Sequence, residues 1–157
     1  MAVPNTFATA TAAIPLSQLD QNFNTAITLG NTAVYLGNTT TSLGNVTLTN
    51  TQVNNYTEGV VAIGNSSTTQ TLVLTSGTVQ TVTLTANCTF TMPTATAGKS
   101  FLLLLNTGAG NLTATFSSVK FPSNTAPTIT TTASRTDIIT FVADGSSWFG
   151  SAVQNYT

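Results

Sequence analysis

The chain has 157 residues and a formal net charge of −1, and only 4% of its residues are charged, against about 25% in ordinary domains. Hydrophobic residues make up 41% of the sequence, which is enough for one modest core. There is no basic patch for nucleic-acid binding and no basic amphipathic helix for a membrane surface, so we expect neither partner. A surface with so little charge suits a chain that packs into an assembly better than a monomer in solution.

Residues 1–26 are expected to form an N-terminal arm with one short helix that serves as an anchor. Ser17 is a suitable N-cap, and Asp20 follows at the spacing of a capping box. We therefore predict a helix from about residue 17 to residue 25. Its apolar face carries Leu19, Phe23 and Ile27. This stripe is expected to pack on a neighbouring subunit or on the rest of a particle, because no nearby segment covers it. The N-terminus lacks a basic region and a long apolar run, so no signal peptide is expected.

Residues 27–70 contain a Leu-Gly-Asn unit that recurs every seven residues, with its leucines at Leu29, Leu36 and Leu43. A coiled coil is disfavoured, because each glycine costs a helix about 1 kcal/mol and only one apolar position per heptad is kept. Gly-Asn is typical of turns. We predict an extended, turn-punctuated oligomerisation segment in which the leucines of three chains meet around an axis. A Gly/Asn-rich linker is the alternative interpretation.

Residues 71–157 are predicted to form an antiparallel β-sandwich that resembles a jelly roll, so the chain as a whole is expected to be mainly β. Short runs of alternating apolar and polar residues are separated by turn signals. The expected strands cover residues 71–75, 79–85, 88–92, 100–106, 112–116, 128–132, 137–143 and 147–152. The run FLLLL, residues 101–105, breaks the alternation and predicts a central strand or one covered on both faces. The TGAGN loop that follows is predicted to be a hairpin turn.

The side chains that usually carry catalysis are missing or scattered. The sequence contains no histidine, which removes the commonest general base and metal ligand. Its four acidic residues lie in different segments, at Asp20, Glu58, Asp137 and Asp144. We therefore predict no enzyme activity, no catalytic residue, no metal site and no cofactor. The single cysteine, Cys88, is expected to be a buried strand residue.

Two further groups near the C-terminus have alternative roles. Arg135 and Asp137 stand two residues apart, and we favour a solvated turn over an ion pair between subunits. Three aromatic residues could bind a glycan at the surface, although packing of a terminal strand is the favoured role. These residues are Trp148, Phe149 and Tyr156.

Two stretches resemble proteins of tailed bacteriophages. IPLSQLDQNFNTAITLGNT looks like an N-terminal segment of tail-fibre and related virion proteins. The region from AGKSFLLLL to the C-terminus, with the elements KFP, TAPT and DGSSWFGS, resembles a C-terminal β module of phage tail proteins. The resemblance implies a homotrimeric virion component that is assembled in the host bacterial cytoplasm, with architectural rather than catalytic motif residues.

The function expected from these observations is that of a small trimeric, tail-fibre-like structural protein, anchored in the virion by its N-terminal region. Its partners would be further copies of itself and other virion proteins of the tail or capsid. A capsid decoration or cement protein is the alternative. A module for binding host surface glycans, which would contribute to host attachment, is a third hypothesis and rests on the aromatic residues.

Overall fold

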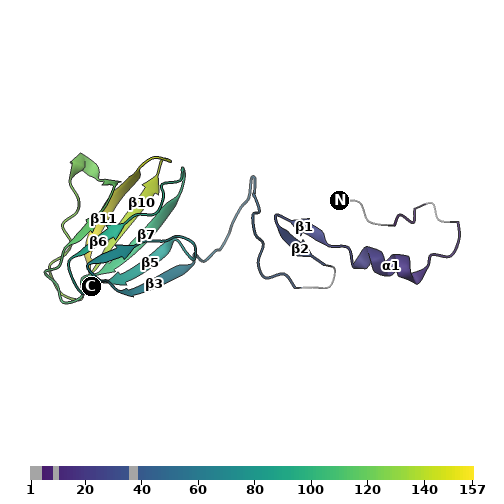
Figure 1. Ribbon diagram of the computed structural model, residues 1–157, viewed down its shortest axis with the longest axis horizontal. Helices are drawn as coiled ribbons and strands as arrows, with labels where there is room; N and C mark the ends of the chain where they lie inside the picture. Colours follow the sequence, from purple (N-terminus) through teal and green to yellow (C-terminus); the bar gives the residue numbers. More distant parts are fainter. Residues whose placement is uncertain (1–4, 9–10, 36–38) are drawn as a thin grey trace. The chain divides into compact units, whose positions relative to one another are not determined.

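The computed structural model describes residues 5–8, 11–35 and 39–157 (Figure 1). Contacts within the chain divide it into an N-terminal unit, Met1–Asn54, and a C-terminal unit, Asn55–Thr157. The chain is mainly β, as predicted, with one short α-helix. The first strands of the C-terminal unit, β3 (Val60–Asn65) and β4 (Thr69–Thr71), fall in the region that the sequence assigns to the extended segment.

The N-terminal unit contains helix α1, Leu16–Phe23, which confirms the predicted helix at residues 17–25. The predicted capping is wrong, because Pro15 occupies the N-cap position and no side chain caps the helix. Proline has a fixed φ and no N–H, so it fits before the first turn, and Ser17 falls inside the helix. The arm is attached to α1 by Asn5, whose main-chain N–H donates to Asn22 Oδ1 at 2.9 Å. Asn22 Nδ2 donates in return to the Asn5 carbonyl at 2.9 Å.

A small hairpin follows, formed by the antiparallel strands β1 (Ile27–Leu29) and β2 (Thr32–Val34). The first Leu-Gly-Asn unit supplies its turn, where Gly30 has a φ of +63° and a Cβ would collide with the carbonyl oxygen of Gly44. Asn31 N–H donates to that carbonyl at 2.9 Å. The first and third Leu-Gly-Asn units therefore lie side by side. The second unit, with Leu36, lies outside the described residues.

The C-terminal unit consists of a larger and a smaller sheet. The larger sheet has the strand order β3-β5-β7-β10-β11-β9 and the smaller has the order β4-β6-β8. The strands not yet located are β5 (Val79–Thr83), β6 (Cys88–Thr91), β7 (Ser100–Asn106), β8 (Ala114–Phe116), β9 (Val119–Lys120), β10 (Thr136–Ala143) and β11 (Trp148–Tyr156). A 3-10 helix, η1 (Pro122–Asn124), follows β9.

From β3 to β8 the chain alternates between the two sheets, so each strand pairs with the next strand but one in the sequence, and these pairs are parallel. Strands β3, β5 and β7 pair in parallel in the larger sheet, as do β4, β6 and β8 in the smaller. Only β10 pairs antiparallel with both its neighbours, β7 and β11. The prediction of an antiparallel, jelly-roll-like arrangement is wrong in this respect, because the alternation of apolar residues is the same in parallel and antiparallel strands. The TGAGN loop consequently connects the two sheets and does not form a hairpin.

Most predicted strands of the C-terminal unit are present, but two are not. The predicted strand at residues 71–75 is wrong, because β4 covers Thr69–Thr71 and ends where that strand was expected to begin. Residues 128–132 form no strand, because Thr130 is hydrogen-bonded to the side chain of Asp137 instead of to a neighbouring strand. Strands β3 and β9 are present although the sequence pattern did not indicate them. Strand β7 matches its predicted range, 100–106, and lies centrally between β5 and β10.

The inner faces of the two sheets share one hydrophobic core. Phe90 and Phe116 stack within the smaller sheet with ring centroids 5.2 Å apart, and Phe101 and Phe141 stack in the larger sheet at 4.7 Å. Phe116 also contacts Phe141 at 5.5 Å, which joins the two layers. Cys88 is buried among these residues, as predicted. The core is therefore dominated by aromatic rings stacked from strand to strand.

Candidate functional site

The N-terminal unit carries many apolar side chains but buries none of its described residues. Each predicted anchoring residue that the structure describes is between 37% and 60% exposed. These residues are Leu19, Phe23, Ile27, Leu29 and Leu43. Six further large apolar residues of this unit are exposed as well, namely Ile14, Leu16, Tyr35, Val46, Leu48 and Val53. A single chain leaves these groups in water, while their role in oligomerisation or anchoring remains a prediction.

The three C-terminal aromatic residues do not share one surface role. Trp148 is only 2% exposed, and its indole Nε1 donates to the carbonyl of Pro93 at 2.7 Å. The favoured prediction of packing is confirmed for Trp148, and its alternative role as a surface-binding aromatic is wrong. Phe149 and Tyr156 are exposed. The Lys120 ammonium lies over the ring of Phe149, 5.4 Å from its centroid.

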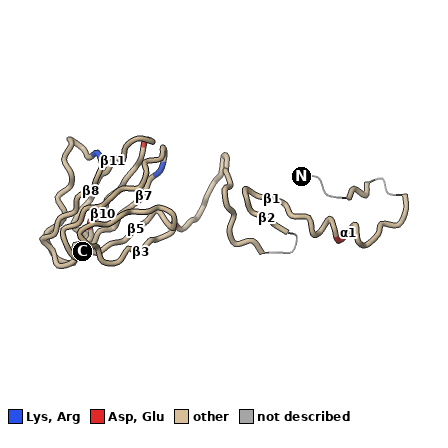
Figure 2. Tube along the Cα trace, in the orientation of Figure 1, with Lys and Arg blue, Asp and Glu red and all other residues tan. Residues whose placement is uncertain are grey.

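A second apolar surface lies on the larger sheet, on the side away from the core. We call it the outer face. Its large apolar residues are Val60, Val79, Leu102, Leu104, Ile138, Val142, Phe149 and Val153. Small residues such as Ser100, Thr140 and Ser151 lie between them. At the described strand positions of this face the only charged residue is Lys120, and the chain as a whole carries few charges (Figure 2).

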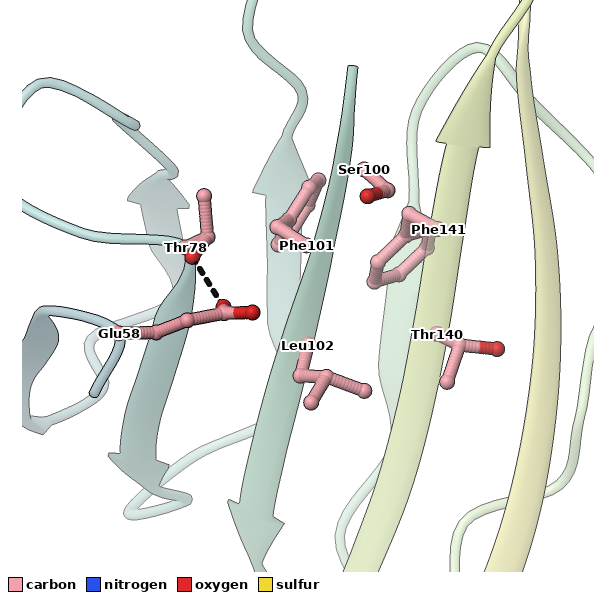
Figure 3. Close-up of a pocket in the computed structure, with 7 residues that line it drawn as sticks. All are labelled: Glu58, Thr78, Ser100, Phe101, Leu102, Thr140 and Phe141. Atoms are coloured by element: carbon pink, nitrogen blue, oxygen red, sulfur yellow. Dashed lines mark hydrogen bonds between the residues drawn. The ribbon is translucent and has the colours of Figure 1, made fainter. Parts of the chain in front are cut away.

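A shallow hollow of about 280 Å³ opens on the outer face beside Glu58 (Figure 3). Glu58 precedes β3, and its carboxylate accepts a hydrogen bond from the Thr78 hydroxyl. Ser100, Leu102 and Thr140 form much of the remaining wall. The hollow contains one carboxylate and no second acid or base, so it offers no pair for general acid–base chemistry. Its lining suits contact with an apolar side chain.

The described residues contain no group of three or more His, Cys, Asp or Glu side chains that could hold a metal ion. The acidic residues Asp137 and Asp144 form structural hydrogen bonds. Asp144 accepts bonds from the main chain of Ser146 and Ser147 in an exposed turn, and these bonds hold the pKa of Asp144 below its usual value.

Asp137 is fully buried, which corrects the prediction of a solvated turn. Its carboxylate accepts hydrogen bonds from the Thr130 N–H at 2.8 Å, the Thr130 hydroxyl at 2.7 Å and the Asn155 N–H at 2.9 Å. Burial acts to raise the pKa of Asp137, but the bonds from Thr130, Asn155 and Gln154 outweigh it and hold the pKa below its usual value. Asp137 thus joins β10, the C-terminal end of β11 and the segment around Thr130 as a charged clamp.

No protein-family model, curated protein or solved structure matches the chain. No helix in the described part of the chain is long and apolar enough to cross a membrane. The two apolar surfaces are therefore the features from which a function can be argued. The outer face was not among the predicted sites, although the FLLLL run was a signal for it. A strand that is apolar on both sides requires a cover on both sides, and here Leu102 and Leu104 are only half-buried.

Proposed function

We propose that this protein is a structural component of a tailed-bacteriophage virion, a small homotrimeric, tail-fibre-like protein that is anchored through its N-terminal unit. The observation that carries the proposal is the N-terminal unit itself, with its row of large apolar residues and no buried one among those described. The sparse charge of the chain and the resemblance of its terminal segments to phage tail proteins support the same function.

The energetic argument concerns the five described anchoring residues. Complete burial of a large apolar side chain contributes about 1.5–3 kcal/mol. Since these residues are 37–60% exposed, burial by neighbouring chains would add roughly 4–7 kcal/mol per chain. A gain of this size is comparable to the whole stability of a small domain. The N-terminal unit therefore depends on contacts that one chain does not supply.

Self-association can be tested on the full chain by light scattering and native mass spectrometry. We expect a species of three times the 16.1 kDa chain mass at micromolar concentration. Changing Leu19 and Phe23 together to Asn should shift the protein towards monomer, because both lie on the exposed apolar side of α1. Asp20→Asn on the same helix is the matched control and should leave the mass unchanged. A monomeric wild-type chain would overturn the proposal.

The position on the particle can be tested by quantitative mass spectrometry of purified virions. A tail fibre predicts from a few to some tens of copies per particle. Hundreds of copies would replace the fibre with the alternative of a capsid decoration protein, which the same apolar N-terminal arm would suit. Absence of the chain from virions would overturn both functions. Glycan binding is not proposed further, because Trp148 is buried in the core.

A further inference from the structure

We propose that the outer face of the larger sheet is a second contact surface between copies of this chain. The half formed by β10, β11 and β9 in one copy packs against the half formed by β3, β5 and β7 in another, and Lys120 lies opposite Glu58. This inference rests on the proposed self-association and adds the surface through which the C-terminal units meet.

The outer face is large enough for such a contact. Its outward residues form three rows across five strands, with Lys120 of β9 added to the first row. Strand spacings of about 4.8 Å and row spacings of about 6.7 Å give an area of roughly 500 Å². Two such faces together bury about 1,000 Å², which reaches the lower limit for a specific interface. Exposed apolar patches of a few hundred Å² on single chains are often functional surfaces.

The first row of the outer face is arranged so that its two halves fit each other. Strand pairing places Lys120, Phe149, Val142 and Ser100 at one level. Val60 pairs with Val79, and Val79 pairs with Leu102. Glu58 and Gly77 each lie two residues earlier in the chain, so they extend the row that contains Ser100. One half is bulky, with Phe149 and Val142, whereas the other has only Ser100 and a glycine. The hollow of Figure 3 lies where this small half borders β10, since its lining includes Ser100 of β7 and Thr140 of β10.

The second row shows the same relation between its halves, and the third row shows it in part. In the second row, Val60, Val79 and Leu102 stand on one side and Thr140 and Ser151 on the other. In the third row, Ala62 and Thr81 are small, Leu104 and Ile138 meet at the centre, and Val153 is large. A second copy turned over about an axis parallel to the strands reverses each row. In the first two rows large residues then oppose small ones. In the third row Val153 opposes Thr81, while Leu104 and Ile138 form an apolar contact at the centre.

The two charges of the outer face also match only in this orientation. Lys120 lies at the β9 edge, held over Phe149, and Glu58 lies at the β3 edge, held by Thr78. Reversal of the rows brings each lysine to the glutamate of the other copy. A copy turned over about an axis across the strands would place the first row opposite the third, which carries no charge, and would leave Lys120 and Glu58 unpaired. Complementary charges therefore favour the alignment with reversed rows over the other. The same pairing of halves closes either a two-fold pair or a three-fold ring, so it is compatible with a trimer.

A cysteine cross-link tests this contact separately from the N-terminal unit. Lys120 and Glu58 are about 24 Å apart across one sheet, at five strand spacings, so cysteines at the two positions cannot bond within one chain. We expect the full-length Glu58→Cys/Lys120→Cys variant to form covalent dimers or trimers on mild oxidation. Each single variant should stay largely uncross-linked. The native Cys88 is buried and should not contribute.

Surface variants provide the matching equilibrium test. Thr140→Lys places a charge at the centre of the outer face and should weaken association of the full chain by roughly tenfold or more. Thr115→Lys, at an exposed position of β8 in the smaller sheet, is the control and should have no effect. An oligomeric chain that gives no cross-link and ignores Thr140→Lys would overturn this inference alone. A monomeric wild-type chain would overturn it together with the proposed self-association.

Discussion

Replacement of Asp137 by Asn tests the role of the buried clamp in the C-terminal unit. The amide keeps one acceptor oxygen, but its NH₂ group faces a donor where the carboxylate accepted a hydrogen bond. One buried N–H, of Thr130 or of Asn155, then loses its partner. A hydrogen bond to a charged group contributes about 1.5–3 kcal/mol, and an unsatisfied buried donor costs about 1–3 kcal/mol. We therefore expect Asp137→Asn to lower the free energy of unfolding by about 3 kcal/mol.

Urea unfolding followed by the fluorescence of Trp148, which is buried in the same unit, measures this change. Asp144→Asn is the control, because Asp144 makes its hydrogen bonds in an exposed turn and should matter far less. The pKa of Asp137 is lower in the folded than in the unfolded chain, so its stabilising effect is complete above pH about 4 and disappears as the pH falls through the folded value. The difference between wild type and Asp137→Asn should shrink over that acidic range. A loss below 1 kcal/mol at neutral pH, or a difference that grows on acidification, would refute the reasoning.

Two further predictions concern the core. Leu103→Ala should lower the free energy of unfolding by about 2–5 kcal/mol, because Leu103 faces the core. Leu102 faces the outer face, so Leu102→Ala should cost less than half of that in the monomer. Equal losses in urea unfolding would contradict this assignment. Burial raises the pKa of the Cys88 thiol, so alkylation by iodoacetamide should be slow in the native protein and rapid in denaturant. Fast labelling without denaturant, followed by mass spectrometry, would show that β6 is not buried.

The candidate surfaces differ in how far the sequence predicts them. The apolar stripe of α1 can be read from the spacing of Leu19 and Phe23, because helical periodicity alone places them on one side. The outer face is only indicated, by the FLLLL run, and its extent depends on which strands flank β7. The correspondence between Glu58 and Lys120 cannot be predicted at all, since it requires the strand order and the register of six strands. Asp137 was similarly missed, because its partners at Thr130 and Asn155 are brought together by the packing of loop and strand.

The sequence by itself determined the class of this protein: mainly β, with one short amphipathic helix, a Gly-Asn turn chemistry after Ile27 and very little charge. These features follow from local preferences, because β-branched residues, alternation and turn residues act within a few positions of the chain. Only the tertiary structure decided that β3, β5 and β7 lie parallel, that the chain alternates between two sheets, and that Trp148 points into the core while Phe149 points out. Strand order and direction depend on contacts between residues far apart in the chain, and the same alternating pattern satisfies many different pairings.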